Sequence, residues 1–504
     1  MIKPTFYILL FLLIAGPLVH ALELGSPFTS HMVLQRDKPV PVWGWAPAGA
    51  PVTVEFAGQR QIVFANEYGR WSLSLESLDT SAEGRSFKVS SGDDHVIQLD
   101  DVMVGEVWIA SGQSNMDQTV ARTPRRPWAG VDNEEEEIAS GDHAMVRLFT
   151  AEPVHSYQPR ECVEGRWQVA SPETVGDFSA IGYFFGRDLS KELDVPVGVV
   201  VVSYGATTAH SWIRREAIDT VPELRSVLDQ FDEQVKQWNP PGLDEWQSFE
   251  LAYNEARAAG VRPPNRPNPH PVQNQRNPTV NFNGMFLAIV PYAARGFLWY
   301  QGESITSPRE LFPRFNETLI RDWRKLWEEE LPFLFCQLAG LRANSNSPQV
   351  RAWQAEALQL PNTGMAVTID IGDEHDVHPK NKQAAADRLV RLALARAYGQ
   401  DVPHTGPVFA RADRLANEVN ISFYGVSGRL AAPDGSLDWF ELAGADGEFY
   451  RANAEIDGNK VRVSHPKVTE PSAIRYAWVN YPEGGGLLFD EAGLPAHPFQ
   501  TDID

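Results

Sequence analysis

A serine and a histidine occur near the ends of two apolar runs of this sequence, and together they could carry out acyl transfer. The stretch GEVWIASGQSNMDQ, from Gly105 to Gln118, predicts a strand that breaks at small residues and then presents Ser114. A serine at a strand-to-helix turn is either a helix N-cap or a nucleophile with backbone N–H donors beside it, and one residue can be both. Met116 stands where a Gly-x-Ser-x-Gly elbow needs its second glycine, so that motif is excluded.

A nucleophilic serine needs a general base, and His378 is the candidate. It lies in HDVHP, after the last apolar strand of the predicted sheet. Asp376 precedes it by two positions, and such a carboxylate can fix the imidazole tautomer and stabilise its cation. Spacing alone does not exclude the neighbours His375 and Asp373. A Ser–His dyad aided by backbone carbonyls is a further alternative.

Acyl transfer also needs donors that point at a developing oxyanion. The run SYGATTAHSW follows another apolar strand, and its Gly205 lets the backbone approach a ligand closely. The run WYQGES follows a third strand and offers the side-chain amide of Gln301. Ligands of parallel sheets bind outside the carboxyl ends of the strands, which is where all these residues are expected.

The chain has the pattern of three folded regions. Short alternating runs with Gly, Pro and Asn turns predict a β domain over residues 22–100, and β signals return over residues 403–504. Between them, residues 101–402 alternate apolar strands with amphipathic helices, which predicts an α/β domain with a parallel sheet. A helical, proline-rich insertion is expected at about 214–280. The acidic run at 134–137 is interpreted as a solvated loop surface.

Composition and targeting signals narrow the partners. The net charge of −22 over 504 residues argues against nucleic acid and anionic membranes, which both need clustered cations. Residues 1–21 have the charged start, apolar run and small residues of a cleaved signal peptide, which predicts a secreted or periplasmic protein without a membrane anchor. Export permits a disulfide between Cys162 and Cys336, although spacing does not show that they meet. The oligomeric state stays open.

Four blocks of the chain resemble the conserved motifs of the sialate O-acetylesterase family of SGNH hydrolases. In order, they are GEVWIASGQSNM, GVVVVSYGATTAHSW, GFLWYQGES and DVHPKNKQ. HMVLQRDKPVPVWGWA near the start and LFDEAGLPAHPFQTD near the end resemble the family's flanking β regions. The resemblance therefore covers most of the chain after the signal peptide and is looser over 214–280.

The resemblance implies a flavodoxin-like α/β/α hydrolase domain, flanked by β-sandwich-like regions, that removes acetyl groups from sugars without a metal or organic cofactor. By position, Ser114 would be the nucleophile and His378 the base, and Ser114 and Gly205 would belong to the oxyanion hole. Two departures stand out. Gln301 replaces the asparagine usual in the third block, and we expect its amide to take over that donor role. His375 occupies the usual position of the acid, and Asp376 is the acid that we expect here.

The substrate is predicted less directly. The acidic charge and the two β regions favour neutral plant cell-wall polysaccharide, such as acetylated xyloglucan or xylan; acetylated sialic acid is the alternative. Aromatic residues flank the motifs, and core packing is the more common role for most of them: Trp108, Tyr204, Trp212, Trp299 and Tyr300. Two other functions would fit the same scaffold, a carbohydrate-binding protein without catalysis and a secreted lipase or thioesterase. The intact Ser114 and His378 argue against the first, and the polar motif surroundings argue against the second.

Overall fold

The computed structural model of the protein describes residues 21–92, 95–124, 126–258, 264, 269–305, 308–343 and 346–503. The signal peptide predicted for residues 1–21 lies almost wholly outside this part of the chain. Within the described part, no helix is both long and apolar enough to span a membrane.

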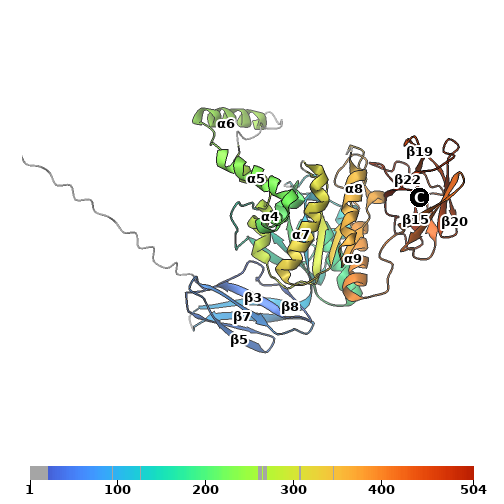
Figure 1. The fold of residues 1–504 in the computed structure, drawn as a ribbon. Coiled ribbons are helices and arrows are strands. Elements are labelled where there is room, and N and C mark those ends of the chain that lie inside the picture. The colour runs from blue at the N-terminus through green and yellow to red at the C-terminus, as the bar shows by residue number, and fades with distance from the viewer. Residues whose placement is uncertain are drawn as a thin grey trace, which may run out of the picture.

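A mainly parallel sheet forms the centre of the molecule, as the alternation of strands and helices predicts (Figure 1). Its order is β10-β9-β11-β8-β12-β13-β14, and only β10 runs antiparallel to its neighbour. The strands are apolar on both sides because helices cover both faces. Their bounds are β8 (His95–Gly112), β9 (His143–Ala151), β10 (Gly165–Ala170), β11 (Val197–Ser203), β12 (Gly296–Tyr300), β13 (Phe333–Cys336) and β14 (Thr363–Ala366).

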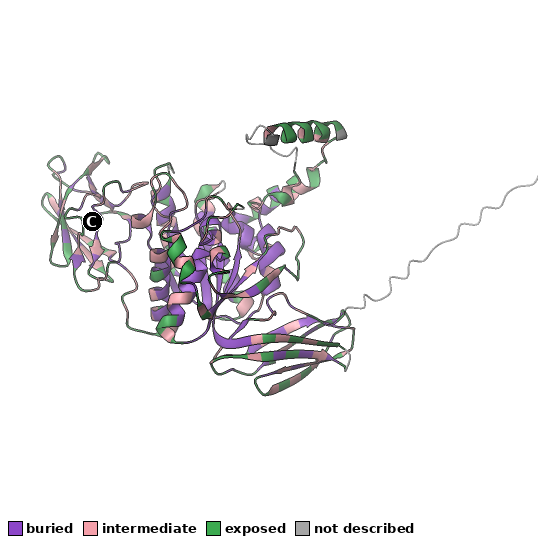
Figure 2. Ribbon diagram, turned by 180° about the vertical axis from the view of Figure 1, so that it is seen from behind, coloured by how far each residue is buried: buried purple, intermediate pink, exposed green. Residues whose placement is uncertain are grey.

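Successive residues of β12 face the two helical layers. Phe297 and Trp299 contact Trp323 of α7 (Phe312–Trp327) on one face. Leu298, between them, belongs to the hydrophobic core on the other side of the sheet, together with residues of α3 (Ala180–Leu193) and α9 (Lys382–Tyr398). Figure 2 shows that buried residues are concentrated in these strands and in the adjoining helix faces. The short helical turns are η1 (Val175–Asp177), η2 (Ala209–Trp212), η3 (Pro271–Gln273), η4 (Phe282–Phe286), η5 (Leu287–Ile289), η6 (Arg309–Leu311), η7 (Glu356–Gln359) and η8 (Ile369–Ile371).

The N-terminal region is all β, in agreement with its turn-rich alternating pattern. One sheet has the order β1-β3-β6, and a second group of strands, which includes β4, β5 and β7, joins β8. The long strand β8 begins in this region and ends in the central sheet, so it runs across the boundary predicted at residues 100–101. The bounds are β1 (Glu23–Leu24), β2 (Val33–Gln35), β3 (Val40–Trp45), β4 (Pro51–Phe56), β5 (Gln59–Phe64), β6 (Arg70–Leu75) and β7 (Ser81–Ser91).

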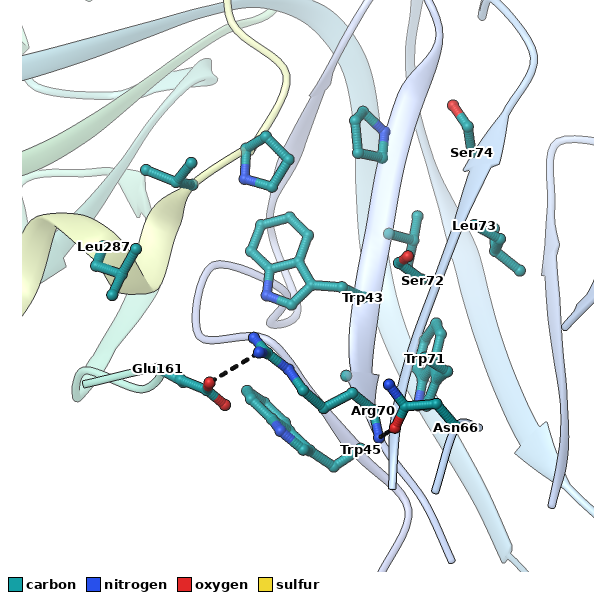
Figure 3. Close-up of a pocket in the computed structure, with 15 residues that line it drawn as sticks. Trp43, Trp45, Asn66, Arg70, Trp71, Ser72, Leu73, Ser74, Glu161 and Leu287 are labelled. Carbon is teal, nitrogen blue, oxygen red and sulfur yellow. Dashed lines mark hydrogen bonds and ion pairs between the residues drawn. The ribbon is translucent and has the colours of Figure 1, made fainter. Parts of the chain in front are cut away.

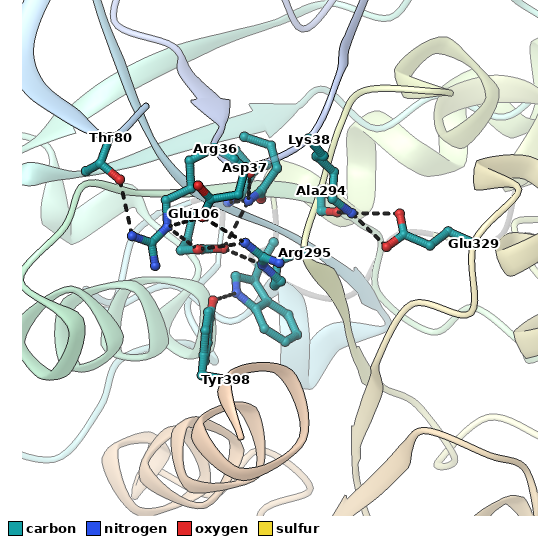
Figure 4. A network of polar contacts seen from close by, with 12 residues as sticks. Arg36, Asp37, Lys38, Thr80, Glu106, Ala294, Arg295, Glu329 and Tyr398 are labelled. Carbon is teal, nitrogen blue, oxygen red and sulfur yellow. Dashed lines mark hydrogen bonds and ion pairs between the residues drawn. The ribbon is translucent and has the colours of Figure 1, made fainter. Parts of the chain in front are cut away.

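A buried carboxylate fastens the N-terminal region to the central sheet (Figure 4). Glu106 of β8 is fully buried and accepts hydrogen bonds from Arg36 at 2.5 Å and from Arg295 at 2.8 Å. Burial by itself would raise the pKa of Glu106, but hydrogen bonds and charge from Arg295 and Arg36 outweigh it and hold that pKa below its ordinary value. Nearby, Lys38 pairs with Glu329 on the surface.

We expect Glu106→Gln to lower the free energy of unfolding by about 3–5 kcal/mol, because it leaves two guanidinium groups without their buried partner. Denaturant unfolding at neutral pH measures the loss. Glu329→Gln is the matched control: its half-exposed pair should be worth no more than about 1 kcal/mol. Since the pKa of Glu106 is lowered by folding, its stabilisation is complete above the ordinary value of 4.5 and is lost as the pH falls through the folded value. Equal losses in both variants would contradict this account.

The C-terminal region is again antiparallel β structure. Its sheets have the orders β15-β16-β21-β20 and β19-β18-β22-β24, and β17 pairs with β23. Inward residues of both four-stranded sheets, such as Val419 and Leu442, belong to one core cluster. The bounds are β15 (Val408–Leu415), β16 (Glu418–Tyr424), β17 (Leu430–Ala431), β18 (Phe440–Ala443), β19 (Phe449–Arg451), β20 (Asn453–Asp457), β21 (Lys460–Ser464), β22 (Ala473–Tyr476), β23 (Phe489–Asp490) and β24 (Phe499–Asp502).

The predicted insertion at 214–280 is helical where it is described, with α4 (Arg215–Asp219), α5 (Pro222–Gln237) and α6 (Leu243–Ala258). In Figure 1, α6 stands away from the central sheet.

The acidic run at 134–137 opens a short helix, α2 (Glu134–Ala139), and does not form the expected loop. Four acidic side chains in a first turn favour a helix because they face the positive end of its dipole. The remaining helices are α1 (Ser114–Asp117) and α8 (Ser347–Ala355).

Candidate active site

Three of the predicted motifs meet because their strands are neighbours in the sheet. Gly112, the last residue of β8, pairs with Ser203 of β11 on one side and with Tyr300 of β12 on the other. Gly112 has φ +141°, and a Cβ at this position would lie 2.2 Å from the carbonyl oxygen of Tyr300. Only glycine allows this close approach, which brings the three loops together at the carboxyl edge of the sheet.

Ser114 is the first residue of α1 and lies directly beside Gly205. A Cβ built on Gly205 would be 3.7 Å from the Cβ of Ser114, an ordinary van der Waals separation. Ser114 is 9% exposed. Within the described part of the chain, the backbone N–H groups of Ser114 and Gly205 donate no hydrogen bond to protein. Two unpaired backbone donors therefore occur on the candidate nucleophile and on the glycine packed beside it, as an oxyanion site requires.

His378 lies in the loop before α9, and that loop contacts the Ser114 turn. Asn115 donates to the carbonyl oxygen of Val377 at 3.0 Å, which joins the residue after Ser114 to the residue before His378. The imidazole stacks on Trp128, with ring centroids 4.3 Å apart. No described residue hydrogen-bonds its buried Nε2, so this nitrogen is free to accept a proton.

Asp376 is positioned as the acidic partner of His378. Its Oδ1 lies 3.4 Å from Nδ1 of His378 and accepts the backbone N–H of the same residue at 2.9 Å. The Nδ1–Oδ1 distance is longer than an ordinary hydrogen bond, and such contacts often shorten when substrate binds. Asp373 instead accepts the backbone N–H groups of His375 and Asp376, which lower its pKa, and His375 is 81% exposed.

The pH profile should reveal the environment of His378. Burial lowers the pKa of His378 to about 4, the charge of Asp376 opposes the shift, and Lys382 and Lys380 add to it. A base must be neutral, so we expect kcat/KM for an acetyl ester to stay high down to about pH 4 and to fall below it. A pH–rate profile, with circular dichroism to confirm folding at each pH, measures this. An acid limb centred at the ordinary value of 6.5 or above would contradict it.

Gln301 is present at the site, but its amide is engaged. Its Nε2 donates to the carbonyl oxygens of Ser304 at 2.8 Å and Thr207 at 3.2 Å. Gln301 is 1% exposed, and within the described ranges its Oε1 has no hydrogen-bond partner. Both amide hydrogens therefore hold the loops after β11 and β12 together, so this geometry does not support the donor role expected from sequence. The Gln301 amide would have to give up its hydrogen bond to one of these carbonyl oxygens before it could donate to an oxyanion.

Sequence reasoning missed a buried polar network under the nucleophile turn. Oδ1 of Asn115 accepts from Nζ of Lys382 at 2.7 Å, and its Nδ2 donates to Glu303. Burial lowers the pKa of Lys382 to about 7, an effect that the charge of Glu303 opposes. Burial also raises the pKa of Glu303. The three residues belong to the GQSNM, WYQGES and DVHPKNKQ blocks. Their place in these blocks is the one feature of the sequence that could have indicated the network.

The Trp128 segment forms one wall of the site and is fixed by two cations. Lys380 donates to the carbonyl oxygens of Trp128 and Ala129 at 2.7 and 3.0 Å. Arg126 pairs with Asp117 at 2.8 Å. Burial raises the pKa of Asp117 to about 6, although the charge of Arg126 acts in the opposite direction. These contacts hold the indole against the His378 ring.

The aromatic residues near the motifs are core residues, with one exception. Relative exposure is 4% or less for Trp108, Trp212, Trp299 and Tyr300. Tyr204 is half-buried and lies against His155, with ring centroids 5.3 Å apart. Burial lowers the pKa of His155. Tyr204, which precedes Gly205, and Trp128, which stacks on His378, both keep part of their aromatic surface exposed.

The two cysteines are separate in the structure. Cys162 is exposed, Cys336 is buried in the central sheet, and both are free thiols. The disulfide that export would permit is not formed. Among the described residues, no group of three or more His, Cys, Asp and Glu side chains could hold a metal ion.

Comparisons with known proteins agree with the motif blocks. A family model described as "Carbohydrate esterase, sialic acid-specific acetylesterase" matches residues 284–399. The sialate O-acetylesterase of Rattus norvegicus is 27% identical, with 100% of this chain and 99% of that protein covered. The Homo sapiens protein of the same name is 25% identical, with 95% and 92% covered. A solved carbohydrate acetylesterase structure from Xanthomonas citri is 30% identical, with a TM-score of 0.80 and coverage of 96% and 100%.

Proposed function

Because the chain belongs to the sialate O-acetylesterase family of carbohydrate esterases, we propose that it hydrolyses O-acetyl esters of sugars with Ser114 as nucleophile and His378 as base. The free, buried Nε2 of His378 is the observation that carries this assignment, since its loop is hydrogen-bonded to the turn of Ser114. The neighbouring N–H groups of Ser114 and Gly205 supply the other requirement of acyl transfer.

In the first half of the reaction, Oγ of Ser114 attacks the acetyl carbonyl carbon while Nε2 of His378 takes the hydroxyl proton. The N–H groups of Ser114 and Gly205 hold the oxyanion; a single donor of this kind contributes about 100- to 1000-fold in rate. The bond from the carbonyl carbon to the sugar oxygen then breaks, and His378 returns the proton to that oxygen. An acetyl-serine remains.

In the second half, water attacks the acetyl-serine carbonyl and gives its proton to His378. The same N–H groups hold the second oxyanion, and collapse releases acetate as His378 protonates Oγ of Ser114. Asp376 orients the imidazole and stabilises its cation in both halves. Gln301 and the network of Asn115, Glu303 and Lys382 position the loops that carry the reacting groups.

Arg276 supports an acidic sugar as the substrate. Its Nε donates to the carbonyl oxygen of Ala206 at 3.1 Å, next to Gly205, and Gln275 contacts the Gly205 carbonyl at 3.4 Å. Arg276 is exposed, and the carbonyl oxygen of Ala206 is the partner of its guanidinium among the described residues. A fixed guanidinium beside the oxyanion glycine can pair with a substrate carboxylate. Acetylated sialic acid carries such a carboxylate. It is also the substrate that the name of the mammalian relatives, sialate O-acetylesterase, suggests.

Acetylated xyloglucan or xylan is the second candidate. Its support is the net charge of −22, which disfavours anionic polymers, and the similarity to a solved carbohydrate acetylesterase. Secretion or export to a periplasm, for which the signal peptide predicted at residues 1–21 is the support, suits either substrate. This location can be tested by recovering the protein from the periplasm or the medium of the cells that produce it and sequencing its N-terminus, which should begin after residue 21.

We expect Arg276→Gln to lower kcat/KM for O-acetylated sialic acid by about 10- to 100-fold, because it removes a charge-assisted hydrogen bond worth about 1.5–3 kcal/mol. Acetate release from acetylated xylan and from p-nitrophenyl acetate should be unchanged. Arg60→Gln, an exposed change on β5, is the control. Equal rates of wild type and Arg276→Gln on the sialic acid ester would contradict the assignment and favour the neutral polysaccharide.

A further inference from the structure

A groove far from Ser114 lies where the β1-β3-β6 sheet of the N-terminal region faces the hydrolase domain (Figure 3). Its volume is about 710 Å³, within the range of ligand pockets. The wall from the hydrolase domain comes from Leu287, Val290 and Pro291, which precede β12. The groove is therefore near the start of β12, whereas Gln301 and the other site loops follow the ends of their strands.

The sheet side of the groove is built by strand alternation. Pro41, Trp43 and Trp45 lie on one face of β3, and the register places Trp43 beside Ser72 and Trp45 beside Arg70 of β6. Trp43 is half-buried and its ring is held edge-on by Phe28, with centroids 4.8 Å apart.

Polar groups line the same surface. Ser72 and Ser74 are exposed on β6. Arg70 forms an ion pair with Glu161 at 2.9 Å, and both side chains keep about half of their exposure, so hydrogen-bonding capacity remains. The pair has no net charge. An indole with adjacent hydroxyls and a neutral ion pair suits a molecule with apolar ring faces and many uncharged hydroxyls.

From these observations we infer that the groove between Trp43 and Leu287 is a second, non-catalytic carbohydrate-binding site that holds an uncharged sugar chain of the acetylated substrate. Trp43 stacks on a sugar ring, and Ser72, Ser74 and the Arg70–Glu161 pair hydrogen-bond its hydroxyls. The inference uses membership of a carbohydrate esterase family but not the identity of the acetylated sugar. Its consequence is retention of a polymer or glycoconjugate while Ser114 acts on the acetyl groups.

The test uses the full chain and two non-acetylated probes, xylohexaose and an N-acetyllactosamine oligosaccharide. Binding is followed by calorimetry. Ser72→Trp fills the groove from an exposed position and should weaken binding by about tenfold or more. Trp43→Ala should do the same by removing the stacking face. Gln98→Trp, an exposed change on the opposite sheet, is the matched control and should bind as the wild type does.

Release of acetate from p-nitrophenyl acetate should be the same in all four proteins, because the groove is distant from Ser114. Unchanged affinity in a folded Ser72→Trp protein would overturn the inference, as would a wild type that binds neither probe. A wild type that binds neither probe but cleaves acetyl esters would leave the proposed esterase function intact. Probe binding lost only in the groove variants supports the site even if the acetyl substrate is another sugar.

Discussion

Ser114→Ala should reduce acetate release from an acetylated sugar by on the order of 10⁴- to 10⁶-fold. Oγ of Ser114 is the protein atom that bonds to the acetyl carbon in the proposed cycle, and Ser114 lies directly beside Gly205. Some catalysis over water should remain, because the oxyanion donors are backbone groups that the change leaves in place. Acetate assay with wild type and variant on acetylated sialic acid and acetylated xylan measures the effect.

Ser304→Ala is the matched control for Ser114→Ala. Ser304 lies in the same group of loops, and it contacts Gln301 and Gln113 through its backbone, which alanine preserves. Its activity should stay within a few-fold of wild type. Acetate release that survives in Ser114→Ala, or that disappears in Ser304→Ala, would move the nucleophile away from Ser114.

His378→Ala should cost activity on a similar scale, because Ser114 would then lack a proton acceptor and the sugar oxygen a proton donor. His375→Ala is the control within the same loop: its side chain is 81% exposed, and the change should have little effect. The kcat/KM of each variant on an acetyl ester at neutral pH gives the comparison. The opposite ranking of the two histidines would refute the assignment of His378.

The acid can be resolved with the same assay. Asp376→Asn should reduce kcat/KM, since it removes the carboxylate beside Nδ1 of His378. Asp373→Asn should reduce kcat/KM less, because Asp373 accepts backbone N–H groups and does not contact the imidazole. A Ser–His dyad would make Asp376→Asn nearly silent. An effect limited to Asp373→Asn would point to loop geometry as the dominant contribution.

The sequence predicted the loops of the site better than their internal contacts. Apolar strands followed by small or polar residues identified Ser114, Gly205, Gln301 and His378, and three of these loops meet because β8 lies between β11 and β12. Strand order itself is a tertiary property. The residue types did not reveal that the Gln301 amide would be held by two carbonyl oxygens, because that depends on loop positions after folding.

The sequence pattern also could not predict polar contacts between residues that are far apart in the chain. Asn115 contacts Glu303 across 188 positions and Lys382 across 267 positions, and no local periodicity relates such residues. Glu106 looked like an ordinary residue of an apolar strand, yet it joins Arg36 and Arg295 inside the protein. The α2 helix was missed for another reason: a run of four glutamates has no apolar face, so helical periodicity was undetectable.

Trapping the acyl-enzyme would show directly whether Ser114 is the nucleophile. The wild-type protein would be mixed with an excess of an O-acetylated sugar, quenched in acid within its turnover time, digested and analysed by peptide mass spectrometry. We expect an acetyl group on Ser114 that is absent without substrate. Acetate release accompanied by an acetyl group on another residue, or by none under conditions that trap a known acetyl-serine enzyme, would contradict it.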